Sequence, residues 1–471
     1  MRVWAGRPGP YANFSAAVIV RFPYTAALAG MSPKNPSQRI KQLFLEFVRS
    51  LAPEDGPSER HSDVPSLTFY QEDLGGLSLW GDSAARHRTT IEKLLAALPE
   101  NKDWSQRDVE KLFERAVLAT LDIREREPQT TDKERSQREA DVLAEALLCP
   151  PTPQELLIPV VGFSVKHLPR RFGGIRFSAA TPATLKRFLS SKGSRLWSDH
   201  FERDLPAEFA VGRLTVRANT PSAAASKARR AVALALDVLN FFADLLHPRD
   251  WKVRVALVEE FPEHHPLVVS FDAGKQTTHV NFAANEFLFP LELPKSTEPL
   301  ARHLGLARCD KFLAATPTEH ERRLLAAVAW AGRATVEPRR EVAFLHYAIA
   351  LETLVIARKV TDSLVREVAV RTALLAHKEP SRRVSAFDDV RRLYDIRSKI
   401  AHSGSLQVTD ADLSDMRWYA KQATVFVLTM AEMKDVQTNA DFEAWIAQNL
   451  LGHRWARARR GTVRGQEGPK P

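Results

Sequence analysis

The chain has 471 residues, too many for one ordinary hydrophobic core, so two or three domains are expected. Hydrophobic residues make up 44% and charged residues 26%, the composition of a soluble globular protein, and no apolar run approaches the roughly 18 residues that a membrane-spanning helix needs. The formal net charge of +10 is compatible with a polyanionic partner but does not identify one.

The start of the chain and its two cysteines indicate the cellular compartment. Near the start, the apolar run AAVIVRF (16–22) is too short for a secretory signal and is interrupted by Arg21. Cys149 and Cys309 are far apart, so they predict neither a disulfide framework nor a zinc knuckle, only single buried or half-buried thiols. We therefore expect a cytoplasmic protein with no membrane segment, no cofactor and no metal.

The first region, residues 1–150, is predicted to be mostly helical. Apolar side chains recur every three or four residues in the segments 37–51, 88–98 and 105–123. The segment 125–141 is charged and poor in apolar residues, which is typical of a solvated helix start or a linker.

Residues 151–315 are predicted to form a mixed α/β domain. Short segments rich in β-branched and aromatic residues, bounded by Pro, Gly and Asp, read as strands. These segments are ELLIPVVGFSV, GGIRFSAA, EFAVGRLTVRA, WKVRVALVEEF, PLVVSFD and THVNFAANEF. One long helix is expected over 222–247, with Thr220-Pro221-Ser222 suited to its cap and first turn. Glu263-His264-His265 is a weak metal candidate, because it lies in a Pro-flanked loop with no predictable third ligand.

Residues 316–452 are predicted to be all helical, with short polar connections typical of an antiparallel bundle. The fold class predicted for the whole chain is therefore α+β. Within the bundle, Trp330 and Trp418 are interpreted as packing residues rather than as platforms for RNA bases. The basic tail, residues 453–471, lacks an apolar period and is expected to be disordered. It either contacts nucleic acid loosely or only improves solubility.

The pair Arg397 and His402, in YDIRSKIAHSGSL, is the first candidate for chemistry. Its spacing is not specific, since Arg195 and His200 match it equally well. The preceding helix has an apolar stripe at Val390, Leu393, Ile396 and Ile400, and Ser403-Gly404 offers a helix stop. On a continuous helix the two side chains would point ~140° apart. If the helix frays at His402, the imidazole can turn back toward the arginine.

Glu352 is the second candidate. In FLHYAIALETLVI a core stripe is expected at Leu345, Ile349, Glu352 and Ile356, so that a carboxylate stands where a leucine would be expected. Burying a carboxylate costs free energy unless it is paired. We expect Arg397 on the neighbouring helix to be its partner.

Together these side chains favour metal-free RNA cleavage. A guanidinium holds phosphate through two N–H donors and stays protonated, and a histidine moves protons near neutral pH. RNA carries its own nucleophile, the 2′-hydroxyl. One such pair is a thin active site, so a two-fold dimer presenting two copies would complete it.

The C-terminal third resembles a HEPN domain of the ApeA-like type. The resemblance covers about residues 318–450, and three motifs carry it: Ala350-Leu351-Glu352 with Leu354, Val-Arg-x4-Leu-Leu near 370–375, and Leu-Tyr-x-x-Arg-Ser-x-Ile-x-His at 393–402. It implies a helical, metal-independent endoribonuclease, usually dimeric, found in bacterial toxins and antiviral defence, with RNA (tRNA among the candidates) as substrate.

By that resemblance, Arg397 and His402 are the catalytic residues and Glu352 supports them. Ser398 fills the polar position after the arginine, and Tyr394 lines the site. A second interpretation stays open: a non-catalytic HEPN module that binds RNA or a protein partner.

Overall fold

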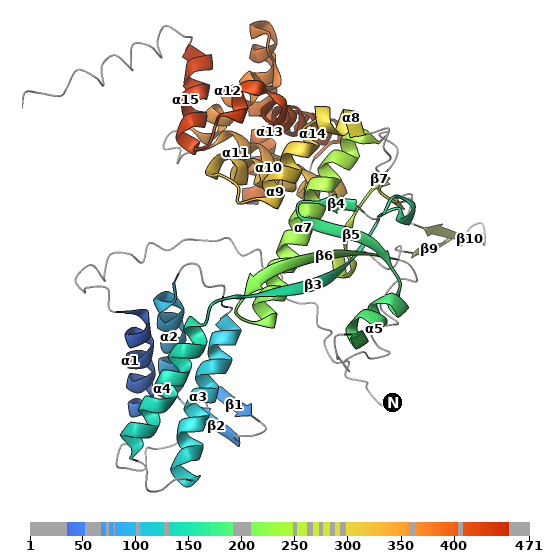
Figure 1. Cartoon of the computed structure of the whole chain (residues 1–471). Helices are drawn as coiled ribbons and strands as arrows, with labels where there is room; N and C mark the ends of the chain where they lie inside the picture. The colour runs from blue at the N-terminus through green and yellow to red at the C-terminus, as the bar shows by residue number, and fades with distance from the viewer. Residues whose placement is uncertain are drawn as a thin grey trace, which may run out of the picture. The chain divides into compact units, whose positions relative to one another are not determined.

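The chain divides into two compact units, residues 1–150 and 151–471, in a computed structural model (Figure 1). The structure describes residues 35–51, 67–71, 75–79, 81–99, 104, 106–126, 131–168, 170–191, 209–247, 252–260, 267–272, 277–282, 288–292, 298–357, 363–403 and 408–451. The segment 16–22 and the tail 453–471 lie outside these ranges. No helix in the described ranges is both long and apolar enough to cross a bilayer.

The described residues of the first unit form four helices and a hairpin. Its elements are α1 (Pro36–Ser50), β1 (Leu67–Gln71), β2 (Gly75–Leu79), α2 (Gly81–Ala97), α3 (Gln106–Arg126) and α4 (Asp132–Leu148). The helices expected over 37–51, 88–98 and 105–123 are confirmed. The charged segment 125–141 holds the end of α3 and the start of α4, where Thr131 and Glu134 form a capping box.

Aromatic rings fill the core of this unit. Phe47 and Phe113 meet edge to face with centroids 5.0 Å apart, and His87 packs against both rings. His87 is buried, and its Nε2 lies 3.7 Å from a carboxylate oxygen of Glu114. Burial lowers the pKa of His87, and burial raises the pKa of Glu114 to about 7 with help from Glu110.

The second unit contains a five-stranded antiparallel sheet in the order β4-β5-β6-β3-β8. Its strands are β3 (Thr152–Val161), β4 (Arg170–Phe172), β5 (Ile175–Ala180), β6 (Phe209–Ala218) and β8 (Ala256–Leu257). Helix α5 (Pro182–Ser191) follows β5. Two smaller pairs accompany the sheet: β7 (Lys252–Val253) with β11 (Leu288–Phe289), and β9 (Leu267–Asp272) with β10 (Thr277–Phe282).

Helix α7 (Pro221–Leu246) lies across one face of this sheet (Figure 1). It begins with the Thr220 side chain accepting from the Ala223 N–H and Pro221 in the first turn, as the sequence predicted. Asn240, buried on α7, bonds both the N–H and the C=O of Val255 at 2.9 Å. These bonds satisfy a backbone segment that enters the short strand β8.

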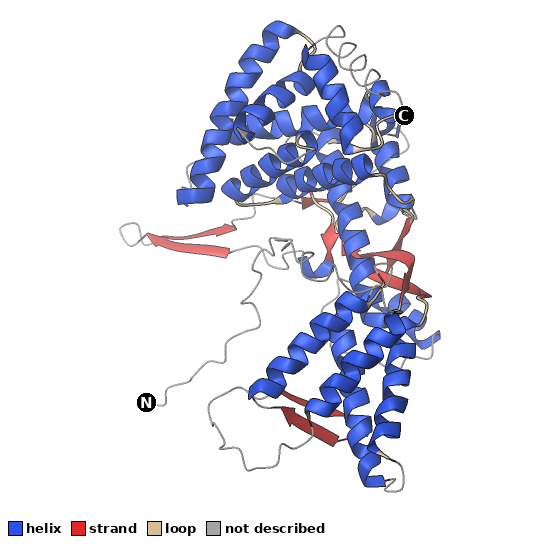
Figure 2. Ribbon diagram, turned by 90° about the vertical axis from the view of Figure 1, so that its left-hand side faces the viewer, coloured by secondary structure: helices blue, strands red, loops and turns tan. Residues whose placement is uncertain are grey.

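The other described elements of the second unit are helices (Figure 2). Its helices are α8 (Glu298–His303), α9 (Leu306–Ala314), α10 (Glu319–Val336), α11 (Arg340–Val355), α12 (Leu364–Ala376), α13 (Pro380–Ser403), α14 (Asp410–Thr429) and α15 (Asn439–Leu451), with a 3₁₀ turn at Ala431–Lys434. Buried residues of the sheet, of α7 and of these helices form one continuous core. The boundary expected at residue 315 therefore lies inside a unit with a shared core.

The mixed α+β fold class is confirmed. Cys309 is buried in the core as expected, whereas Cys149, at the end of α4, is exposed and not half-buried. The helix expected over 88–98 begins earlier, at Gly81, so that it contributes His87 to the first unit's core.

Helices α7 and α10 are in close backbone contact at Gly332. A Cβ added there would lie 1.8 Å from the carbonyl oxygen of Asp237, so the helices cannot keep this distance with any other residue. We predict that Gly332→Ala lowers the free energy of unfolding by roughly 1–3 kcal/mol, although alanine is the better helix former. Denaturant unfolding measures this, with the exposed Arg322→Ala on α10 as control. A stability gain in Gly332→Ala would contradict the contact.

The raised pKa of Glu114 makes the stability of the first unit depend on pH. The folded state holds the proton more tightly than the unfolded state, so the stability of this unit falls as pH rises from about 4.5 to about 7. We predict that Glu114→Gln raises the melting temperature at pH 8 and changes it little at pH 4. Calorimetry of the full chain at both pH values measures this, with Glu92→Gln, exposed on α2, as control. An equal effect at both pH values would contradict the ionisation argument.

Candidate functional site

Helix α13 carries the candidate residues on and beside its buried stripe. Val390 and Leu393 are fully buried and Ile400 is buried, as the sequence predicted, while Ile396 is only partly buried. The stripe packs α13 against α11 and α12.

Tyr394 anchors α13 to α11. Its ring is buried, and its hydroxyl donates to the carbonyl oxygen of Ala348 at 3.1 Å. Burial raises the pKa of Tyr394 well above its usual value, and the nearby Glu352 carboxylate adds to the effect. The phenol is therefore neutral and committed to the backbone, so Tyr394 positions the helix and does not offer its hydroxyl to a ligand.

Arg397 pairs with Glu352, as predicted. Its Nη2 lies 3.2 Å from Oε1 of Glu352 and donates to Oε2 at 3.5 Å, the long end of the hydrogen-bond range. The side chains are 30% and 21% exposed, so the pair opens to solvent. Burial raises the pKa of Glu352 and the arginine opposes this shift.

The pairing is incomplete. Nε of Arg397 and Oε1 of Glu352 are both buried, and neither has a hydrogen-bond partner among the described residues. A guanidinium has five N–H donors in a planar fork, and this one commits only Nη2 to the carboxylate. Nε is shielded from solvent, so an anion could reach only the exposed part of the guanidinium, whose side chain is 30% exposed.

The core stripe predicted through Glu352 is not the deepest side of α11. Leu345, Ile349, Glu352 and Ile356 are all only partly buried. The buried positions of α11 are instead Ala343, Phe344, Tyr347, Ala348, Ala350, Leu351, Leu354 and Val355. Helix α11 is covered on most of its circumference, so an apolar period could not distinguish its deepest side. Glu352 thus lies at the margin of the core, where it reaches both Arg397 and solvent.

Within one copy of the chain, the side chains of Arg397 and His402 do not point toward each other. Helix α13 continues through Ser403, so the condition under which His402 could turn back toward Arg397, a helix that frays at His402, is not met. Five residues of continuous helix separate the two side chains by ~140° around the axis and ~7.5 Å along it. The His402 side chain is exposed and that of Ser398 is partly buried. Gly404, the predicted helix stop, lies outside the described residues.

Other sequence candidates do not add to this site. Arg195, His200 and the Glu263-His264-His265 loop lie outside the described ranges. In the part of the chain that the structure describes, no group of three or more His, Cys, Asp or Glu side chains is arranged to hold a metal ion. Trp418, interpreted as a packing residue, is 43% exposed, with the ring of His377 centred 5.3 Å away.

Arg371 is a buried charge whose role the sequence analysis did not predict. It is 2% exposed and donates to Glu367 on its own helix, to both oxygens of Glu443 on α15, and to the Val355 carbonyl that ends α11. Its signal in the sequence is the one that identified Glu352, a charge among apolar helix positions. Its donors are directed to protein acceptors, so Arg371 joins three helices instead of binding a ligand.

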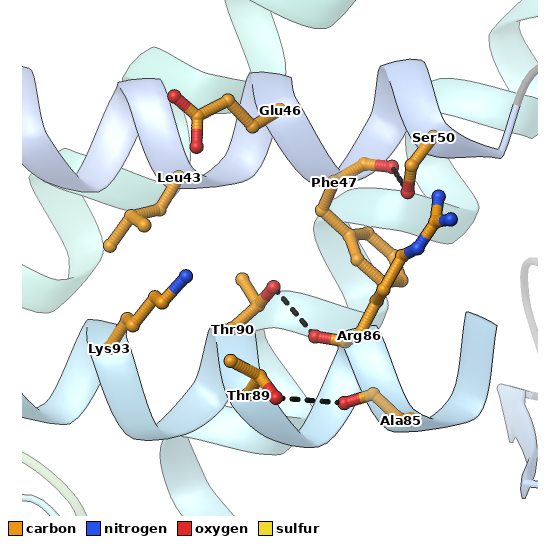
Figure 3. Close-up of a pocket in the computed structure, with 9 residues that line it drawn as sticks. All are labelled: Leu43, Glu46, Phe47, Ser50, Ala85, Arg86, Thr89, Thr90 and Lys93. Atoms are coloured by element: carbon orange, nitrogen blue, oxygen red, sulfur yellow. Dashed lines mark hydrogen bonds between the residues drawn. The ribbon is translucent and has the colours of Figure 1, made fainter. Parts of the chain in front are cut away.

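A cavity of about 370 Å³ lies between α1 and α2 in the first unit (Figure 3). Leu43 and Phe47 line it from α1, and Arg86 and Lys93 extend into it from α2. The hydroxyls of Thr89 and Thr90 donate back to their own helix. It contains none of the predicted site residues.

The comparisons with known proteins found no relative. No family model matches the chain, and no curated protein and no solved structure matches it significantly.

The half-buried pair generates a prediction for stability. Removing Arg397 leaves the Glu352 carboxylate unpaired and raises its pKa further, so the stability loss grows as pH rises above the unfolded value of about 4.5. We predict that Arg397→Met costs roughly 1–2 kcal/mol at pH 8 and less at pH 4.

Adding Glu352→Leu to Arg397→Met should restore much of the loss, because the uncompensated charge is then gone. Denaturant unfolding of the wild type, both single variants and the double variant gives the coupling free energy. A coupling near zero at pH 8 would show that the two side chains act independently.

Proposed function

We propose that the protein is a metal-independent endoribonuclease of the HEPN type, with Arg397 and His402 as its catalytic residues. One observation supports this most: Arg397 makes one long hydrogen bond to Glu352, its side chain is 30% exposed, and it lies on the same helix as the exposed His402. A guanidinium in this state suits an incoming phosphate.

The proposed roles follow from the chemistry of each group. The 2′-hydroxyl oxygen attacks phosphorus and the bond from phosphorus to the 5′-oxygen breaks, giving a 2′,3′-cyclic phosphate and a free 5′-hydroxyl. His402 takes the proton of the attacking hydroxyl, and the departing 5′-oxygen takes up a proton from water. Arg397 binds the phosphate oxygens and stabilises their added charge. Glu352 keeps the guanidinium in place.

A second copy of the chain completes this site. Because Arg397 and His402 diverge on one continuous helix, one copy does not direct both groups at the same phosphate. A two-fold dimer that brings two α13 helices together would supply an arginine from one copy and a histidine from the other. A toxin or antiviral role in the cytoplasm, with RNA as substrate, belongs to the same proposal.

The divergence of Arg397 and His402 also favours a second candidate. A module that only binds RNA or a protein partner needs the open guanidinium but not the imidazole. In that case RNA binding would be sensitive to salt, produce no fragments and be indifferent to His402.

We predict that the purified protein cleaves single-stranded RNA or tRNA in the presence of a chelator, and that Arg397→Ala or His402→Ala reduces the rate by at least ~100-fold, the scale of a lost general base or oxyanion contact. Gel analysis of end-labelled RNA measures this, and the 2′,3′-cyclic phosphate end identifies the mechanism.

Matched controls separate the site from surface charge in general. Arg382→Ala changes another exposed arginine on α13, and His303→Ala changes another exposed histidine near a helix end. Both should leave cleavage unchanged. Full activity in His402→Ala would rule out the proposed site, and salt-sensitive binding without cleavage at any concentration would favour the non-catalytic module.

A further inference from the structure

Three arginines lie directly opposite one another on adjacent strands of the sheet. Arg171 of β4 pairs in register with Arg176 of β5, and Arg176 pairs with Arg213 of β6. Arg217 lies four residues further along β6, and side chains alternate faces along a strand, so it shares the face of Arg213. We call Arg171, Arg176, Arg213 and Arg217 the arginine face.

The opposite face of the sheet is closed. A Cβ at Gly212, the residue before Arg213, would contact Ile175 and Phe177 of β5 and Val232 of α7. Positions of this parity therefore point into the core under α7, and the arginines point away from it. All four arginine side chains are exposed. Figure 1 shows α7 against the sheet with β4, β5 and β6 side by side.

The charge on this face is poorly balanced. Arg213 donates to Glu155 of β3 at 2.5 Å. For Arg171, Arg176 and Arg217, the described residues provide no ion pair or side-chain hydrogen bond. Like charges directly opposite each other destabilise a sheet, so this ladder does not serve the stability of the fold. An external anion with several charges would relieve the repulsion.

We propose that the arginine face binds the phosphate backbone of single-stranded RNA. Strands in a sheet are ~4.8 Å apart, so the three opposed arginines span ~10 Å across β4, β5 and β6. Arg217 extends the row ~13 Å along β6, at ~3.3 Å per residue. A flexible chain of phosphates can follow such a path, and guanidinium groups bind phosphate oxygens in bidentate fashion. Contacts of this kind read no sequence.

The choice of RNA rests on the proposed function. The arginine face and the pair Arg397–Glu352 belong to the same compact unit, whose sheet and helices share one core. A nuclease site with one arginine and one histidine per copy holds its substrate weakly. An extended cationic surface on the same unit would supply the affinity that this site lacks.

The test measures binding apart from cleavage. In a His402→Ala background, fluorescence anisotropy follows a labelled 20-nucleotide single-stranded RNA with and without Arg171→Gln, Arg176→Gln and Arg217→Gln together. These three arginines are chosen because the pair Arg213–Glu155 then remains intact. We expect Kd to rise about tenfold at 50 mM salt and the slope of log K against log salt to flatten by roughly 2, because each single-strand phosphate contact contributes about 0.7.

A matched triple variant controls for net charge. Arg302→Gln, Arg339→Gln and Arg382→Gln remove the same charge from exposed arginines outside the sheet, each paired with a glutamate. It should change Kd less than twofold. The arginine-face variant should melt no lower than its parent, since it removes repulsion.

The proposal is overturned if the two triple variants bind RNA equally well, or if the arginine-face variant loses only its binding to vesicles containing phosphatidylserine. The latter outcome would assign the surface to a membrane. The nuclease proposal can fail independently: cleavage that persists in His402→Ala would end it without altering the binding result.

Discussion

The second unit depends on the close contact between α7 and α10. At Gly332 the helices approach until the Asp237 carbonyl leaves no space for a side chain. Beside this contact, Asp237 accepts from Arg333 at 2.6 Å, and burial raises the pKa of Asp237 to about 7 against the arginine's influence. About two turns further along α7, Asp244 pairs with Arg417 and with the buried Lys421 of α14. Because α7 also covers the sheet, these contacts make the sheet and the helices one body.

Arg371 and Arg397 differ in burial and in how completely their guanidinium groups are hydrogen-bonded. Arg371 is enclosed, and carboxylates and a carbonyl accept from it in good geometry, which is how a buried cation becomes tolerable. Arg397 is partly exposed, makes one long hydrogen bond and leaves a buried Nε without a partner among the described residues. A group selected only to stabilise the fold would resemble Arg371. The incomplete pairing of Arg397 is the observation on which the proposed phosphate contact rests.

The sequence predicted most elements but few of the contacts that matter for function. Alternation and helical periodicity are local, so β3, β6, α7 and α13 were found with small boundary errors. The pair Arg397–Glu352 was also predicted, since a carboxylate among apolar positions requires a partner. The end of α13 agrees with the stop offered by Ser403-Gly404, since the described helix ends at Ser403. The arginine face could not be predicted from the sequence. Arg171, Arg176 and Arg213 come together only through strand register, which a single sequence does not reveal.

The arrangement of charge in the second unit follows from this register. Helix α7 covers one face of the sheet, so the exposed positions of the other face have to carry polar side chains, beside a small apolar cluster that includes Phe209 and Val211. Any soluble sheet could meet that requirement with mixed charges, and Glu155 opposite Thr215, beside Arg213, is such a solution. The neighbouring positions on β4 and β5 carry arginine instead, where a threonine would satisfy the strand at no electrostatic cost. Repulsion between aligned cations is tolerated in a fold when a ligand of opposite charge is present for part of the time, since binding to the folded state alone offsets it.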